Sequence, residues 1–433
     1  MLIPLVSSLL LLAPAAAGTE LPAAAPAVPE TGRVVQVETR DGRTYSGELG
    51  GLSDGTLRID TSTGPSTVKL GDLLLLAIEP EEASAPGDEV ETVAGAPDLL
   101  FLAPIPTGDG EQPGDRLVGR VMGGDAYGLR FAIDGGATFE VPFEEVERLL
   151  PAADQPVDRL ALLTGGGADD RVWRRRPDGS LDSLTGVVAG VNAGTLSFES
   201  ALGSLDFGLP EVLAVVFAPS PAPAQPLPGT PVVVRLASGT RLQGGLLELG
   251  PSSFTLATRL SERLTLPTAA LSSMVHRGEG NHLLADLLPA SVDERPSIGG
   301  PDDFLFPWRA DLSVTGRPLS VGGVLRATGL GVHSHSRLGF DLPAGVTALR
   351  VTVGLSDEVA ELPAQGSVTF EILVDGERRG ASGVLREGEP PKVLRVDGLA
   401  DARRLELVVG DGGDDDAGDR AAWVDGVLLS PRK

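Results

Sequence analysis

An internal repeat constrains the fold of this chain more than any other feature. In four places a glycine is followed, ten residues later, by an apolar residue, and a turn-forming sequence lies between the two. The four pairs are Gly47 and Leu57, Gly119 and Leu129, Gly186 and Leu196, and Gly244 and Phe254. A pattern that returns four times indicates four copies of one small structural unit.

Each copy continues with apolar residues at fixed spacings. Two of them alternate, and a third follows five residues later, as in Val68, Leu70 and Leu75; Phe139, Val141 and Val146; Leu205, Phe207 and Val212; and Leu264, Leu266 and Leu271. Alternation of this kind is typical of half-buried strands. The glycines that begin the copies fall inside a strand, where glycine usually marks a bulge or a sharp bend. We therefore expect a five-stranded antiparallel meander that closes as a small barrel and, in its pattern, resembles an Sm-like barrel.

The chain is long enough for several domains. Residues 1–17 have the apolar run and the small-residue exit of a signal peptide, and the run is too short to span a bilayer. Proline-rich and acidic stretches, such as Pro219 to Pro231, indicate linkers, and Gly278 to Asn281 looks like another. The expected order is a signal peptide (1–17), a disordered tether (18–32), barrel units at 33–79, 98–150, 157–218 and 230–278, and a last domain at 280–433.

Composition excludes several classes of function. The chain has no cysteine and therefore no disulfide or thiolate metal site, and its formal net charge of −25 would repel a nucleic acid. Catalytic signatures such as a glycine–serine nucleophile elbow are absent from the sequence, and we expect no enzyme activity. An exported chain without disulfides must fold on its apolar cores alone. We expect a secreted or periplasmic protein of a bacterial cell envelope, without a transmembrane segment once the signal is removed.

The C-terminal third of the chain holds an ordered series of short pieces: Leu283 to Val292, Gly329 to Ser336, Val353 to Val359, Gly366 to Glu377, Ala400 to Asp414, and Ala421 to Leu429. In order and spacing these pieces resemble the NPCBM family, the novel putative carbohydrate-binding modules. The resemblance implies a β-sandwich of the jelly-roll, galactose-binding-like type, so the fold class of the whole chain is expected to be all-β. It also implies a carbohydrate ligand, with galactose-type sugars as the first candidates.

Four residues of this segment are candidates for contact with a sugar. His333 and His335 alternate along the sequence, so on one strand both side chains would face the same way. A neutral imidazole both donates and accepts hydrogen bonds, which suits a sugar hydroxyl. Trp423 offers an apolar ring face, and Asp425 is an acceptor near it on the same expected strand. A purely structural role for one histidine and a core position for Trp423 are the alternatives.

An acidic glycine loop precedes this last strand. Asp411, Asp414, Asp416 and Asp419 give it the oxygen density and the flexibility that calcium favours, although their spacing differs from that of the helix-loop-helix calcium motif. Asp357 and Glu358 form a second, weaker candidate. The alternative is that both are solvated turns. Calcium is the only cofactor that the sequence suggests.

Two functions remain open. The first is non-catalytic binding of a carbohydrate at or outside the cell surface, with the barrel units as spacers or docking units. The second is a structural or protein-interaction component of the cell envelope, with envelope proteins as partners, in which the sandwich binds no sugar. The sequence leaves the particular sugar and the oligomeric state open.

Overall fold

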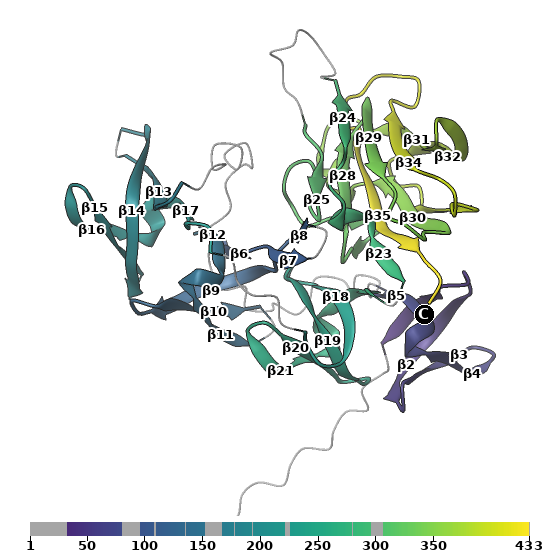
Figure 1. Cartoon of the computed structure of the whole chain (residues 1–433), viewed down its shortest axis with the longest axis horizontal. Helices are drawn as coiled ribbons and strands as arrows, with labels where there is room; N and C mark the ends of the chain where they lie inside the picture. Colours follow the sequence, from purple (N-terminus) through teal and green to yellow (C-terminus); the bar gives the residue numbers. More distant parts are fainter. Residues whose placement is uncertain are drawn as a thin grey trace, which may run out of the picture. The chain divides into compact units, whose positions relative to one another are not determined.

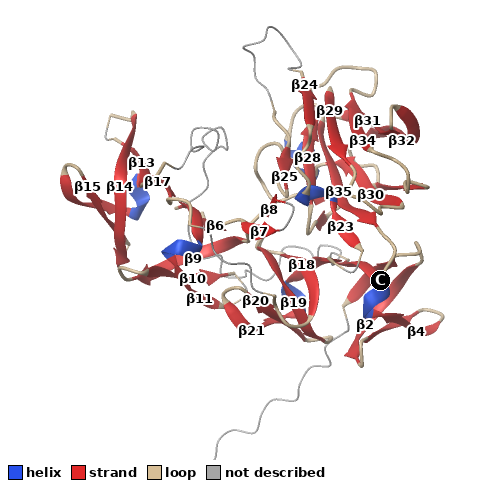
Figure 2. Cartoon of the chain, in the orientation of Figure 1, coloured by secondary structure: helices blue, strands red, loops and turns tan. Residues whose placement is uncertain are grey.

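The structure is a computed structural model, and strands make up nearly all of its regular structure (Figure 2). It describes residues 33–79, 96–107, 110–134, 136–151, 167–176, 178–192, 194–220, 226–278, 280–295 and 306–432. All of these belong to one compact unit, residues 32–433. The all-β fold class expected from the sequence is confirmed. The signal peptide and the tether (1–17 and 18–32) lie outside the described residues.

Four five-stranded units follow one another along the chain (Figure 1). Unit 1 contains β1 (Val34–Thr39), β2 (Thr44–Ser53), β3 (Thr56–Thr61), β4 (Gly64–Lys69) and β5 (Leu73–Ile78). Unit 2 contains β6 (Asp98–Leu102), β9 (Arg116–Gly124), β10 (Gly128–Ile133), β11 (Thr138–Pro142) and β12 (Val146–Leu150), and β7 (Ile105–Thr107) and β8 (Gly110–Gln112) form a hairpin inside it. Unit 3 contains β13 (Asp170–Arg175), β14 (Leu181–Asn192), β15 (Thr195–Ser200), β16 (Gly203–Gly208) and β17 (Val212–Val216). Unit 4 contains β18 (Thr230–Leu236), β19 (Arg241–Leu249), β20 (Ser253–Thr258), β21 (Ser261–Pro267) and β22 (Leu271–His276).

The four units share one pairing scheme. The first four strands form an antiparallel meander, and the first strand also pairs with the fifth, as β1 does with β2 and β5. A single-turn 3-10 helix separates the fourth strand from the fifth in every unit. Because the described pairing runs fourth, third, second, first, fifth, closure into an Sm-like barrel stays a prediction.

The repeated glycines are needed for a different reason than expected. None of the four has a positive φ, and the bulges lie a few residues further on, directly before Gly51, Gly123 and Gly190 in the first three units. At Gly119 an added Cβ would lie 1.9 Å from the carbonyl oxygen of Ala132 on the paired strand. The glycines therefore permit close approach of two backbones.

The apolar register expected for unit 1 was wrong by two residues. Val68 faces Leu57 across β3 and β4, as Val141 faces Leu129 in unit 2, so Val68 takes the second apolar position and not the first. Leu70 instead begins the 3-10 helix, where it is buried. The equivalent of Val146 is consequently Leu73.

The units associate in two pairs through their last strands. Unit 1 joins unit 4 where Leu76 of β5 pairs with Met274 of β22. Unit 2 joins unit 3 where Leu149 of β12 pairs with Val215 of β17. Within its own unit, each of these four residues also lies opposite the equivalent residue of the first strand. The contact between units 1 and 4 therefore has the same register as the contact between units 2 and 3. Unit 4 also contacts unit 2, since the Asp115 carboxylate accepts from the Gln243 amide at 2.8 Å.

The C-terminal segment is a sandwich of two sheets. One contains β25 (Arg309–Ala310), β28 (Gly329–His333), β35 (Arg420–Leu429), β30 (Ala348–Leu355) and β33 (Lys392–Asp397), with β23 (Asn281–Leu283) paired to β35. The other contains β24 (Ser291–Glu294), β29 (Ser336–Asp341), β34 (Arg404–Gly410), β31 (Ser367–Val374) and β32 (Glu377–Arg386). A short hairpin of β26 (Ser320–Val321) and β27 (Val324–Leu325) accompanies them.

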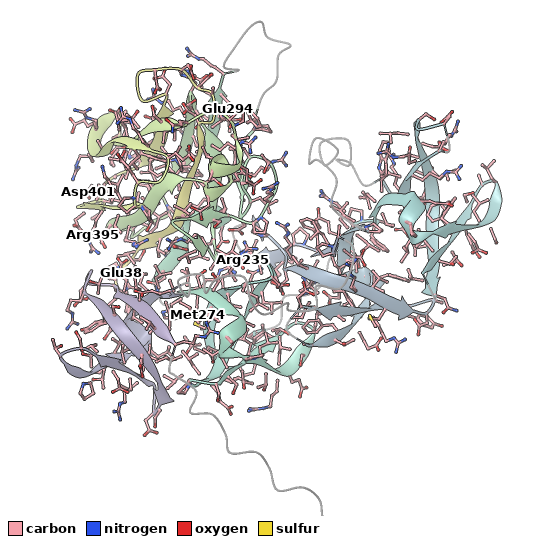
Figure 3. The ribbon with its side chains drawn as sticks, turned by 180° about the vertical axis from the view of Figure 1, so that it is seen from behind. Glu38, Arg235, Met274, Glu294, Arg395 and Asp401 are labelled. Atoms are coloured by element: carbon pink, nitrogen blue, oxygen red, sulfur yellow. The ribbon has the colours of Figure 1, made fainter. Side chains whose placement is uncertain are left out.

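The sandwich is joined to units 1 and 4 by a shared apolar core and by buried ion pairs. The core combines residues of all three: Leu74, Leu75, Val233, Val275, Leu283, Ala327, Ala348, Val427 and Leu429. Arg350 of β30 forms an ion pair with Glu38, and Arg235 donates to the Arg326 and Asp311 carbonyls; Figure 3 labels Glu38 and Arg235. Gly278 and Asn281, the ends of the expected linker, form a bridge with each other, and the domain boundary there stays a prediction.

Candidate functional site

The candidate site lies at one end of the sandwich, where several connections between strands meet. β28 and β29 are joined by the turn at Ser334 and His335. His333 pairs with Arg420, so this turn lies beside the loop 411–419 that joins β34 to β35. Leu355 pairs with Ala421, which brings the connection after β30 to the same end.

His333 is the central polar group of this end. It is 7% exposed, and its ring stacks on Phe306 with centroids 4.9 Å apart and planes 12° from parallel. The guanidinium of Arg420 lies over the same Phe306 ring, 5.6 Å from its centroid. Burial lowers the pKa of His333 to about 4, although Asp416 acts in the opposite direction. The imidazole is therefore neutral at pH 7 and can both donate and accept a hydrogen bond.

Two buried carboxylates accompany the histidine. Asp419 is fully buried and Asp416 is 6% exposed. Asp419 accepts from the Ser367 amide at 2.8 Å through Oδ1, but Oδ2 of both aspartates has no hydrogen-bond partner. Burial raises the pKa of Asp419 to about 7; hydrogen bonding from the Ser367 amide and the Ser334 hydroxyl opposes the shift, and the neighbouring Asp414 and Asp416 add to it. Unpartnered buried acceptors are unfavourable unless a ligand, an ion or water supplies the missing bond.

Of the remaining aspartates, Asp411 bonds the backbone of the loop itself, and Asp414 ties the loop to β31. Asp411 accepts from the Gly413 amide at 3.0 Å, and Asp414 accepts from the Ser367 hydroxyl at 2.7 Å. Across the described part of the chain, no three acidic or histidine side chains converge as metal ligands would. Asp411, Asp414, Asp416 and Asp419 are thus neighbours, but they are not arranged as a formed calcium cage.

The second acidic pair has structural roles. Asp357 accepts from the Gly322 and Gly323 amides and fixes the hairpin of β26 and β27. Glu358 is buried and accepts from the Thr315 hydroxyl at 2.6 Å.

The sequence suggested that His333 and His335 share a strand, but they do not. β28 ends at His333, and His335 lies in the turn with a φ of 60°. Its side chain is 41% exposed, and its Nε2 is 3.8 Å from a carboxylate oxygen of Asp411. It therefore lies at the accessible rim of the site, while His333 lies inside it.

Trp423 and Asp425 were wrongly predicted to line a contact surface. Trp423 is fully buried in the sandwich core and meets Phe370 edge to face at 4.9 Å. Asp425 is 1% exposed and pairs with Arg326 at 3.3 Å, near the junction with units 1 and 4. Burial raises its pKa, and the nearby arginines oppose that shift. Both residues belong to β35, which is buried on both faces.

Sequence reasoning missed two members of the site, Phe306 and Arg420. Phe306 comes from a connection distant in sequence, and only the fold brings its ring onto His333. Arg420 directly precedes the Ala-Ala-Trp sequence and pairs with His333 across β28 and β35. The only signal for Arg420 in the sequence was its position directly before Ala421, where the last matching piece begins.

Comparison with known proteins identifies the C-terminal domain. The NPCBM/NEW2 domain model matches residues 291–429. Over 119 residues the chain is 31% identical to the alpha-1,3-galactosidase B of Akkermansia muciniphila, a match that covers 27% of this chain and 15% of that protein. The chain thus spans only a small part of this relative.

Solved structures of CBM51 modules are also similar. CBM51 from Clostridium perfringens GH95, in complex with methyl-galactose, is 24% identical, with a TM-score of 0.30 and coverage of 34% of this chain and 99% of that one. CBM51-2 from Clostridium perfringens ZmpB, in complex with GlcNAc, is 22% identical, with a TM-score of 0.31 and coverage of 43% and 38%. The tandem CBM51 modules of Sp3GH98 from Streptococcus pneumoniae are 10% identical, with a TM-score of 0.31 and coverage of 92% and 88%.

Proposed function

We propose that the NPCBM domain at residues 291–429 binds a carbohydrate, held at the loop end of the sandwich around His333. The observation that carries the proposal is the pair of buried oxygens, Asp416 Oδ2 and Asp419 Oδ2, that lack partners beside a neutral imidazole. A sugar presents several hydroxyl donors in a small space, which is what such acceptors need.

Each group has a role in this proposal. His333 exchanges hydrogen bonds with one hydroxyl, and Asp416 and Asp419 accept from others. Arg420 contributes N–H donors, and its stacking on Phe306 limits its movement. His335, exposed at the rim, contacts an outer part of the ligand. Trp423 does not contact the sugar. It packs in the sandwich core and holds β35, the strand that begins at Arg420.

Galactose-type sugars are the first ligands to test. The support is the identity to a protein named alpha-1,3-galactosidase B, together with the methyl-galactose bound to one similar module. Calcium is the second ligand to test. Asp416 and Asp419 offer it two unsatisfied oxygens, and hard oxygen donors are what calcium prefers.

We further propose that binding is non-catalytic and that the protein is exported to the bacterial envelope or beyond. Export is supported by the signal-like residues 1–17. In the part of the chain that the structure describes, no helix has the length and apolarity to cross a membrane. Non-catalytic binding is supported by the family match, which is to a binding domain.

Calorimetric titration of the full chain with methyl-galactose, with and without calcium, tests the proposal. His333→Ala should weaken binding by about 1–3 kcal/mol, or roughly 5–150-fold, because a polar ligand group loses its partner. Asp419→Asn should weaken it comparably. His282→Ala is the matched control, since His282 is exposed and bonds to Ser430 at the other end of the sandwich.

A screen of neutral and charged glycans extends the same experiment. Binding to another sugar that is lost in His333→Ala supports the site and corrects the ligand. If the folded chain binds no glycan in either condition, the alternative holds, and the protein is a structural or protein-interaction component of the envelope.

A further inference from the structure

Unit 3 has an unusual outer sheet face. Alternate residues of β13 and β14 point to the same side of the sheet. Arg171 pairs with Thr185, Trp173 with Ser183, and Arg175 with Leu181. We define the outer face of unit 3 as Arg171, Trp173, Arg175, Leu181, Ser183, Thr185 and Val187.

This face is open to solvent along β14. Ser183 and Thr185 are exposed, Leu181 is 42% exposed and Val187 is 56% exposed. The corresponding row of β19 in unit 4 is covered: Arg241 is 2% exposed and Gln243 is 6% exposed. There the sandwich lies against Arg241 through Asp311, and unit 2 lies against Gln243. The same face of the same unit is therefore a packing surface elsewhere in this chain.

The charges on the outer face of unit 3 are ordered from one strand to the next. β13 contributes the arginines, and β14 contributes an uncharged row in which Leu181 and Val187 flank Ser183 and Thr185. On β15, Glu199 is exposed and pairs with Val187 in the ladder, so it lies at the far margin. Asp182 belongs to the opposite side of β14, where it pairs with Arg174 and Arg176. The order is thus basic, uncharged, acidic.

We infer that this face docks on the same face of a second copy of the chain. A two-fold axis parallel to β14 would lay β14 over β14 and place β13 of each copy opposite β15 of the other. The uncharged β14 rows, with Leu181 and Val187 as their apolar members, then meet at the centre. Arg171 of each copy comes within reach of Glu199 of the other at both margins. A face with this order of charges is complementary to itself under that rotation, although the chain as a whole is acidic.

The size of the face sets the strength of the contact. Three strands about 4.8 Å apart, each with about seven residues, cover roughly 300–400 Å² per copy. A stable dimer buries about 800 Å² per partner. The second copy therefore binds weakly, and dimers form only at high protein concentration.

Sedimentation velocity of the full chain, from about 1 to 500 µM, tests the inference over the range in which small interfaces associate. The weight-average sedimentation coefficient should rise towards the dimer value. Val187→Glu should hold it at the monomer value, because the acidic group enters the apolar centre. Leu202→Glu is the matched control: Leu202 is 78% exposed in the turn between β15 and β16, and its replacement should leave association unchanged.

A charge exchange identifies the partner face. Arg171→Glu and Glu199→Arg should each weaken association at least several-fold, and the double variant should restore it. A chain that stays monomeric at every concentration overturns the inference, as does association that Leu202→Glu abolishes and Val187→Glu does not. Monomers that bind heparin through Arg171 also overturn it, since the occupant would then be a polyanion.

Discussion

Units 1 and 4 form one pair and units 2 and 3 the other. The two pairs have the same strand pairing but different side chains on their outer faces. Four equivalent positions of the first strands show the difference. In units 1 and 4 they are Glu38 and Arg235, which are buried against the sandwich. In units 2 and 3 they are Phe101 and Trp173, which remain partly exposed. The apolar interior specifies the unit, while a few outward side chains decide whether it holds another domain.

The largest effect is expected when the buried ion pair between the sandwich and unit 1 is broken by removing Arg350. Arg350→Ala leaves Glu38 buried without its cation, and stability should fall by about 3–5 kcal/mol. Urea unfolding of the full chain measures the loss. Arg337→Ala, which removes an exposed pair with Glu406, should cost less than about 1 kcal/mol. Equal effects of the two replacements would show that the junction contributes little.

The next test compares the two pairs directly. Gly119→Ala and Gly244→Ala should each destabilise the chain by about 2–4 kcal/mol, because a Cβ would meet the carbonyl of the paired strand. Gly208→Ala is the control, since its Cβ would meet only ordinary contacts. Thermal unfolding measures all three. A tolerated Gly119→Ala beside a damaging Gly244→Ala would mean that the pairs are less alike than their register indicates.

Acid should act on the sandwich through His333. Its pKa is about 4 in the folded chain and near 6.5 in the unfolded chain, so below pH 6.5 the unfolded chain binds more protons. Unfolding free energy should therefore fall as pH drops from 6.5 to 4, by about 2–3 kcal/mol from this group. The raised pKa of Asp419 has the opposite effect on stability. Between about pH 4 and 7 the folded chain holds this proton more tightly than the unfolded chain, so the contribution of Asp419 to the unfolding free energy falls as pH rises.

Denaturation of His333→Gln across this range isolates the contribution of the histidine. The variant should show a shallower loss of stability between pH 6.5 and 4 than the natural chain. His282→Gln should follow the natural chain. Identical profiles for the natural chain and His333→Gln would mean that the imidazole is hydrated in both states.

The smallest effect is expected on the outer face of unit 3. Trp173→Ser should reduce stability by only about 1 kcal/mol, because the indole is half-buried on a face that the sandwich does not cover. Urea unfolding at low protein concentration measures it. A loss above about 3 kcal/mol would show that Trp173 packs as tightly as its counterpart Arg235.

The interior of the fold could be predicted from the sequence because it repeats. The ten-residue spacing after each repeated glycine predicted the buried side chains Leu57, Leu129, Leu196 and Phe254, and the NPCBM resemblance predicted the sandwich. The register failed in unit 1, where Leu70 continues the apolar alternation but begins a helix. Local pattern cannot separate the last strand position from the first helical one.

The candidate site was harder to predict for a physical reason. Trp423 and Asp425 adjoin the acidic loop in sequence, but burial depends on what covers the other face of β35. Units 1 and 4 supply part of that cover, with Arg350 reaching both Glu38 and the Asp425 carbonyl. Likewise Phe306 meets His333 only through tertiary packing. The sequence indicated which strand ends carry the site. Which side chains point into the site could be seen only in the folded structure.

The attachment of the last strand to the first unit has a consequence for how the chain folds. Arg40 donates to the Ser430 carbonyl, and Arg432 pairs with Asp72. Contacts between residues so distant in sequence require closure of very long loops, which slows folding. During synthesis unit 1 would emerge long before unit 4 and the sandwich. Until they are made, Leu74 and Leu75 would remain exposed to solvent. Passage through this open intermediate, more than the strength of any finished contact, should set the time in which the protein matures and its exposure to aggregation.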